Sequence, residues 1–180
     1  MASVREPPSP IALYFDAVLQ ERLRASFPAG ARVLDLGGGS GRAAEGLEAA
    51  GVRVMRLALD APPPEGGPYD GAFATGAGAF PPGNGVAWLA EALRPGAPVI
   101  LRVVPRPGAG PRDVRRAMGP AFLWGSALAL GLVVPSEARG AWAERYPQTF
   151  GVLAAVEGVL RRWPVLRFHG RAVVLEGVRR

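Results

Sequence analysis

A run of glycines follows a single acid early in the chain, where residues 33–42 read VLDLGGGSGR. Glycine at alternate positions lets the backbone turn without Cβ clashes and brings amide N–H groups close to a ligand. Asp35, two residues before the first glycine, adds a carboxylate at the end of an expected strand. A carboxylate there suits a ligand with an ammonium group better than one with a pyrophosphate. The segment therefore predicts a loop that binds the polar part of a nucleotide-like cofactor.

The segments around this loop alternate between strand and helix patterns. Strands are expected at 31–36, 52–59, 69–75, 97–104 and 171–178. Helices are expected at 11–26, 41–50 and 84–93, from 111 through 121–134, and at 141–163. The alternation predicts one α/β domain over residues 1–180, with a parallel sheet covered by helices on both faces. Within it we expect a cofactor-binding half at 1–110 and a helical cover with a final strand at 111–180.

Three segments in this order resemble class I S-adenosylmethionine (SAM) dependent methyltransferases. DLGGGSG at 35–41 resembles the first motif of the family, YDGAFAT at 69–75 its fourth strand, and LAEALRPG at 89–96 the helix and turn before its fifth strand. The resemblance implies a Rossmann-like fold, SAM as cofactor, a glycine loop around the methionine and ribose parts, and an acid near the amino group. The cofactor-binding residues implied are Asp35, Gly37, Gly38, Gly39, Gly41, Asp60 and Thr75.

The sequence departs from this family after the second strand. The acid that binds both ribose hydroxyls in the family falls on Ala58, and the nearest carboxylate is Asp60, two residues later. Asp60 can serve the ribose or, as an alternative, the adenine amino group. Residues 61–68 are rich in proline and glycine and too few for the helix and third strand that the family has there. We therefore expect a sheet that is reduced at one edge.

Positive charge is concentrated toward the C-terminus. Residues 1–100 carry 8 arginines against 10 acids and residues 101–180 carry 13 against 5, which sums to the net charge of +6. This basic part suits an anionic membrane, a nucleic acid or an acidic substrate. No interleaving of aromatic and basic residues points to RNA, so a nucleic-acid partner is not expected. Scarce asparagine and glutamine together with abundant proline predict a thermophilic source.

Several chemistries and locations are disfavoured. The chain has no cysteine and one histidine, so a metal site is not expected. Its first residues lack the apolar stretch of a secretory signal, which predicts a cytoplasmic protein. Glycines and two prolines interrupt the uncharged stretch 118–136, which favours a buried helix over a membrane span. His169 is expected in a surface turn and Tyr14 in the core.

A SAM-dependent methyltransferase is the function that these observations favour. The cofactor supplies the chemistry, so no catalytic residue is identified. Residues 115–120, 131–136 and 143–150 resemble the substrate-side insert of ubiquinone and menaquinone biosynthesis methyltransferases, which implies a small apolar or quinone-like acceptor. The resemblance fits the uncharged stretch 118–136 and its basic flank, which favours peripheral membrane contact. Alternatives are a degenerate methyltransferase-like domain that acts as a binding or assembly protein, an RNA methyltransferase, and a dinucleotide-binding protein. A homodimer that covers the reduced edge is a further expectation.

Overall fold

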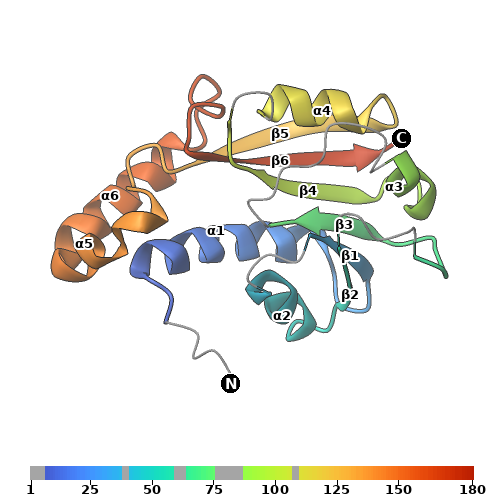
Figure 1. The fold of residues 1–180 in the computed structure, drawn as a ribbon, viewed down its shortest axis with the longest axis horizontal. Helices are drawn as coiled ribbons and strands as arrows, with labels where there is room; N and C mark the ends of the chain where they lie inside the picture. Colours follow the sequence, from blue (N-terminus) through green and yellow to red (C-terminus); the bar gives the residue numbers. More distant parts are fainter. Residues whose placement is uncertain (1–6, 38–40, 59–63, 76–86, 107–109) are drawn as a thin grey trace.

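The computed structural model describes residues 7–37, 41–58, 64–75, 87–106 and 110–180. Six strands form one sheet in the order β2-β1-β3-β4-β6-β5 (Figure 1). They are β1 (Arg32–Leu36), β2 (Arg53–Leu57), β3 (Gly71–Ala74), β4 (Pro98–Val103), β5 (Phe122–Leu130) and β6 (Ala172–Arg179). The first four are parallel, and β6 runs antiparallel to β4 and β5. The ends of β1, β3 and β4 therefore meet the start of β6 at one edge, which we call the C-terminal edge.

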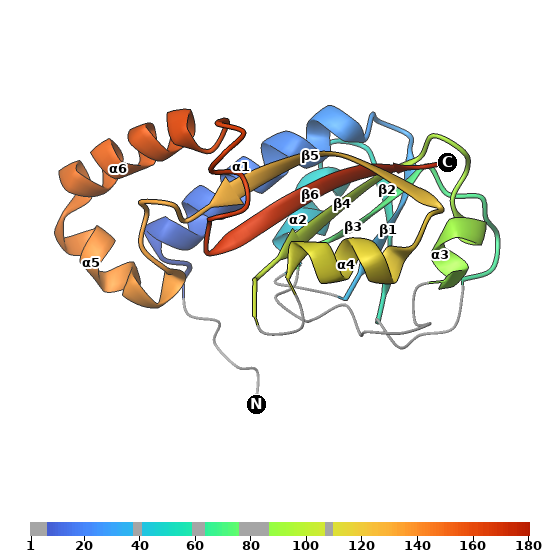
Figure 2. The same cartoon turned by 90° about the horizontal axis from the view of Figure 1, so that it is seen from above.

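Helices cover both faces of this sheet, as predicted. They are α1 (Pro10–Ser26), α2 (Arg42–Glu48), α3 (Ala87–Ala92), α4 (Pro111–Met118), α5 (Gly140–Arg145) and α6 (Pro147–Leu160), with a 3₁₀ turn at Glu137–Arg139. α1, α2 and α5 pack on one face in a core with Phe73 and Ile100, whereas α3 and α4 pack on the other with Leu101. Figure 2 shows the sheet between α1 and α4, and α5 and α6 beyond its end.

Local sequence explains the longest helix. Ser9 caps α1, because its Oγ accepts the amide N–H of Ala12 at 3.3 Å, and Pro10 occupies the first turn, where its missing N–H costs nothing. Ile11, Phe15 and other buried residues recur at helical spacing and fill the groove against the sheet.

The C-terminal part corrects one expectation. Residues 121–134 do not form a helix, because β5 spans Phe122–Leu130 and pairs with β6 from Phe122 opposite Arg179 to Leu130 opposite Ala172. Gly119 and Gly131 bound the strand with φ of 72° and 71°, values that a right-handed helix does not contain. A continuous apolar run has no clear period, so pairing with β6 decides its structure. The expected helix 141–163 is also two helices, because Pro147 begins a new one after Tyr146.

β2 is the last strand on its side of the described sheet. Within the described residues no further strand pairs with it, and residues 59–63, which follow, lie outside the described part. In the described ranges, every helix is too short or too polar to cross a bilayer.

Candidate cofactor-binding site

The glycine loop begins at the end of β1 and leads into α2. Gly37 has φ of 83° and donates its N–H to the carbonyl oxygen of Leu57 at 2.8 Å, which ties the ends of β1 and β2 together. Gly41 precedes α2 with φ of 80°. L-residues adopt such values only at a cost, so both positions favour glycine. Gly38 and Gly39 lie outside the described residues, and their predicted role is not tested.

Asp35 is a buried acid at the end of the strand that precedes this loop. It is 1% exposed, and within the described part of the chain no hydrogen-bond partner reaches its Oδ1. Burial raises the pKa of this carboxyl, Arg56 opposes the rise, and Glu48 adds to it. An unsatisfied buried acceptor costs about 1–3 kcal/mol. A ligand that donates a hydrogen bond to Asp35, as an ammonium group does, would recover that energy.

Contacts between α1 and α2 hold the loop in place. Gln20 of α1 donates its Nε2 hydrogens to the carbonyl oxygens of Arg42 at 2.8 Å and Ala43 at 3.1 Å. Arg42 also pairs with Asp16 at 2.8 Å. A Cβ at Gly46 would lie 2.4 Å from the Gln20 side chain, so the two helices touch closely. These contacts fix the first turn of α2, and with it the far end of the loop.

Thr75 directly follows β3, the neighbour of β1, so it lies on the same C-terminal edge as Asp35 and Gly37. Ala58 follows β2 on this edge and is exposed. It offers no carboxylate for a ribose. Asp60 lies outside the described residues, so its contribution to this edge remains a prediction.

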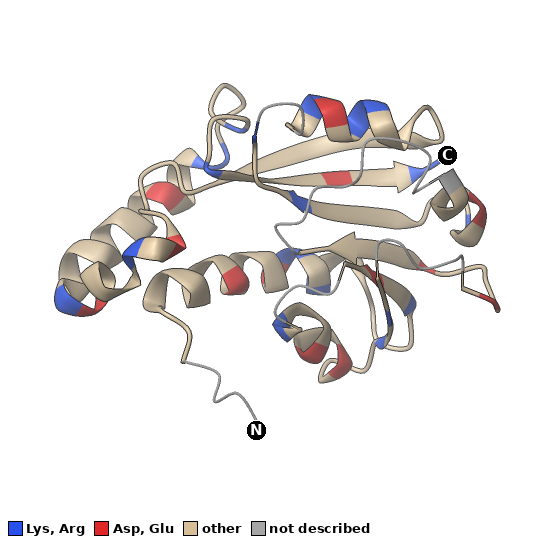
Figure 3. Cartoon of the chain, viewed as in Figure 1, with Lys and Arg blue, Asp and Glu red and all other residues tan. Residues whose placement is uncertain are grey.

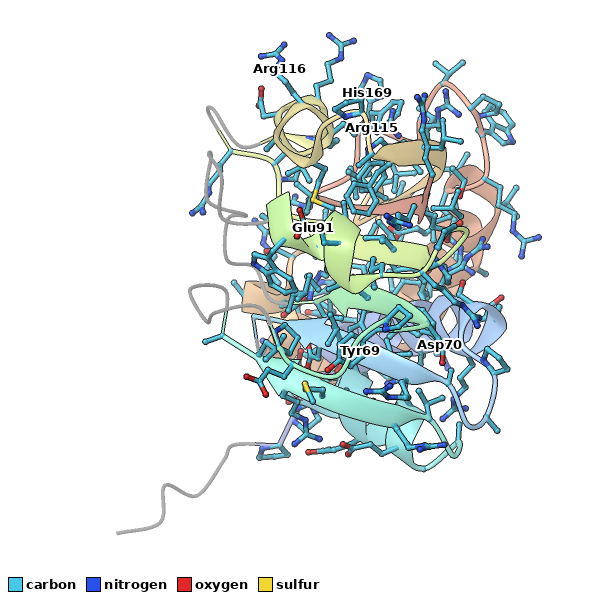
Figure 4. The ribbon with its side chains drawn as sticks, turned by 90° about the vertical axis from the view of Figure 1, so that its right-hand side faces the viewer. Tyr69, Asp70, Glu91, Arg115, Arg116 and His169 are labelled. Atoms are coloured by element: carbon cyan, nitrogen blue, oxygen red, sulfur yellow. The ribbon has the colours of Figure 1, made fainter. Side chains whose placement is uncertain are left out.

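Tyr69 and Asp70 lie at the opposite edge, where β3 begins. Asp70 accepts the amide N–H of Arg32 at 2.8 Å and pairs with Arg94 at 2.9 Å, while the Tyr69 hydroxyl donates to the carbonyl oxygen of Glu65 at 3.0 Å. Figure 4 shows both residues together, away from Arg115 and His169. They therefore join the starts of β1 and β3, and Asp70 is a structural acid.

Two residues with other candidate roles are also placed. Tyr14 packs edge-on against Phe150 at 6.1 Å between ring centroids, and its hydroxyl donates to the carbonyl oxygen of Ala154 at 3.3 Å, so it joins α1 to α6. His169 is exposed in the turn before β6. It lines a pocket with arginines of α4, a grouping that the sequence analysis missed.

Comparison with known proteins identifies the fold. No family model and no curated protein matches the sequence. Solved structures do match at 14% identity. One is geranyl diphosphate methyltransferase in complex with SAM, with a TM-score of 0.59 and coverage of 94% of this chain and 86% of that one. Another is a TehB-like SAM-dependent methyltransferase from Corynebacterium glutamicum, with a TM-score of 0.59 and coverage of 90% of this chain and 88% of that one. The chain has the class I methyltransferase fold. The [4+2]-cyclase SpnF matches similarly well, with a TM-score of 0.58 and coverage of 93% of this chain and 82% of that one, so the fold does not determine the reaction.

Proposed function

We propose that the chain is a SAM-dependent methyltransferase that acts on a small molecule. The observation that carries the proposal is Asp35, a buried carboxylate with an unpartnered oxygen at the end of β1, directly before a loop whose described glycines have positive φ. In the class I fold this is the edge at which the parallel strands end, and such edges are where α/β proteins bind ligands.

The described residues fit one end of SAM. Asp35 would hold the ammonium group of the methionyl part, and Gly37 and Gly41 would let the backbone approach the cofactor closely. Thr75 would line the site from the end of β3. When bound, SAM supplies an activated methyl group on a sulfonium. The chain's own task is to orient cofactor and acceptor for an in-line transfer and to exclude water.

The ribose end supports a second candidate function. Ala58 stands where the family has its ribose-binding acid, and β2 is the edge strand of the described sheet. A domain that had lost these elements would bind SAM weakly and serve as a binding or assembly protein without catalysis. This candidate predicts no measurable SAM binding, whereas the first predicts binding that depends on Asp35.

The proposal also covers the class of methyl acceptor. In its general form the acceptor is a small molecule, and in its narrower form the acceptor is apolar or quinone-like. The narrower form rested on the resemblance to the quinone methyltransferases and fitted the uncharged stretch 118–136, which contains the strand β5 and not the expected helix. The narrower form keeps support from α6, because its outward residues Val152 and Val159 are each 63% exposed. Trp163, which follows this helix, is 56% exposed. With the arginines nearby, this face suits peripheral contact with an anionic membrane.

Titration calorimetry with SAM tests the proposal. The wild-type chain should bind SAM, and Asp35→Asn should weaken binding roughly tenfold or more, because a hydrogen bond to a charged group contributes about 1.5–3 kcal/mol. Glu91→Gln is the matched control, since it makes the same change on the exposed face of α3. If the wild type does not bind SAM, the assembly-protein candidate is favoured. If Glu91→Gln weakens binding as much as Asp35→Asn, Asp35 has no special role.

A further inference from the structure

A pocket of about 520 Å³ lies between α4 and the turn before β6. Arg112, Arg115 and Arg116 line it from α4, and Phe168 and His169 line it from the turn. Figure 4 shows Arg115, Arg116 and His169 gathered at one end of the molecule, and Figure 3 shows basic residues on α4 and on the chain before β6. We call this the arginine pocket.

Positive charge in the arginine pocket is not balanced by acids. Arg167, next to Phe168, adds a fourth guanidinium to the three on α4. Within the described ranges, none of these four arginines forms an ion pair. Asp113, the one acid in the lining, accepts the Gly110 amide N–H at 2.9 Å. The three arginines of the lining and Arg167 beside them therefore outnumber the single carboxylate of Asp113.

Two of these arginines are held against the same aromatic ring. The Cζ atoms of Arg115 and Arg167 lie 5.2 Å and 5.0 Å from the ring centroid of Phe168. The Nε of each is buried and has no hydrogen-bond partner among the described residues. Burial lowers the pKa of Arg115, and the like charge of Arg167 lowers it further. Two like charges, each with an unpaired buried donor, are an arrangement that an anion would stabilise.

The charge and the volume indicate which anion fits. A single carboxylate would neutralise only one of four guanidinium groups, whereas a phosphate monoester or diphosphate carries two or more charges and several oxygens for the forked N–H donors of arginine. The pocket volume falls in the usual range for small-molecule sites, about 300–1,000 Å³.

The position of the pocket links it to the cofactor edge. Pro111 begins α4 after the end of β4, and His169 lies in the turn three residues before β6 begins, so both lie at the C-terminal edge that carries Asp35. β1, which carries Asp35, and β6, which follows the pocket turn, are separated by two strands, and this corresponds to about 14 Å at the usual strand spacing. One small molecule can span that distance.

We propose that the arginine pocket binds a phosphate or diphosphate group carried by the methyl acceptor. This inference rests on the proposed methyltransferase function and narrows it, because it assigns the acceptor an anionic end as well as the part that receives the methyl group. The phosphate group would form hydrogen bonds with Arg115 and Arg116, and the remainder of the acceptor would extend along the edge toward the cofactor.

Titration of the purified full chain with pyrophosphate and with inorganic phosphate tests the pocket. The wild type should bind pyrophosphate more tightly than phosphate, and the double variant Arg115→Gln/Arg116→Gln should weaken pyrophosphate binding roughly tenfold or more. The matched control is Arg139→Gln/Arg145→Gln, which removes the same charge from exposed positions beside α5 and should bind as the wild type does. Circular dichroism checks that both variants fold.

Three outcomes would overturn the assignment. The first is that the wild type does not bind pyrophosphate, and the second is that the pocket and control variants lose equal affinity for it. The third is that binding to phosphatidylglycerol vesicles depends on Arg115 and Arg116 while pyrophosphate does not bind, which would assign the arginines to a lipid surface. A parallel SAM titration separates this inference from the proposed function. SAM binding without pyrophosphate binding overturns the pocket alone, whereas pyrophosphate binding without SAM binding supports the pocket and overturns the methyltransferase.

Discussion

Asp35 is a carboxylate that the folded chain keeps from water without giving its Oδ1 a partner among the described residues. Such a group lowers stability in the absence of a ligand and is retained where function requires it. Asp35 could be predicted from the sequence because an acid before a glycine loop is a local pattern. Burial and the lack of a partner depend on α2 and β2, and only the structure reveals them.

The raised pKa of Asp35 predicts a pH-dependent effect of Asp35→Asn. Between the ordinary pKa and the raised one, the folded chain binds the proton more tightly than the unfolded chain, so stability falls as pH rises through this window. Above the window the full cost of the buried charge is present. Asp35→Asn should therefore stabilise the ligand-free chain at pH 7 by about 1 kcal/mol, or about 2–4 °C in Tm, with little effect below the ordinary pKa. Thermal unfolding of the wild type and of Asp35→Asn, at pH 7 and at a pH below the ordinary pKa, measures the change in stability. An equal change at the two pH values would contradict the argument from burial.

Gly37→Ala separates backbone strain from cofactor binding. Alanine at φ of 83° should cost about 1–2 kcal/mol of stability and weaken SAM binding, since the loop must shift. Gly30→Ala is the control, because Gly30 has φ of 84° and an added Cβ would meet nothing within 4 Å. It should lose similar stability and keep its SAM affinity. Equal SAM affinities in the two variants would remove Gly37 from the site.

At the scale of the elements, hydrogen bonds of Glu157 hold α6 against the segment that follows β5. Its buried carboxylate accepts the amide N–H groups of Gly131 at 2.8 Å, Val133 at 3.2 Å and Val134 at 2.9 Å, directly after β5. No local pattern marks an acid inside an apolar helix for this role. The three amides become partners only because β5 is a strand that ends beside α6.

Glu157→Ala should therefore lower the free energy of unfolding by about 3 kcal/mol, because three amide groups lose their acceptor. Glu157→Gln keeps one carbonyl oxygen and should lose about 1 kcal/mol. Glu144→Ala, at an exposed position of α5, should stay within about 0.5 kcal/mol of the wild type. Urea denaturation gives all three values. A loss for Glu157→Ala no larger than that for Glu144→Ala would show that this attachment contributes nothing.

The strands of the cofactor half could be predicted from sequence, and β5 could not. β1 and β3 are short apolar runs bounded by glycine or polar residues, and their parallel order follows from the alternation with helices. β5 depends on pairing with β6, which begins 42 residues after β5 ends, from Leu130 to Ala172. The arginine pocket was missed for the same reason, since Arg115 and His169 meet only in the folded chain.

For the whole molecule, the apolar face of α6 and the basic C-terminal part predict binding to anionic membranes. The chain should bind vesicles that contain phosphatidylglycerol better than vesicles of phosphatidylcholine alone. Val159→Ser/Trp163→Ser should reduce this binding, because Val159 on α6 and Trp163, which follows this helix, both have exposed side chains. Leu123→Ser is the control, an exposed apolar residue on β5. Vesicle sedimentation measures the three proteins, and equal binding by all of them would exclude α6 as the contact.

The central claim is that Asp35 holds the ammonium group of SAM. Titration of the wild type and of Asp35→Asn with S-adenosylhomocysteine and with methylthioadenosine tests it most directly, because the second ligand keeps the adenosine and sulfur but lacks the amino-acid part. The wild type should prefer S-adenosylhomocysteine roughly tenfold or more, and Asp35→Asn should lose most of that preference. A preference that persists unchanged in Asp35→Asn would contradict the account.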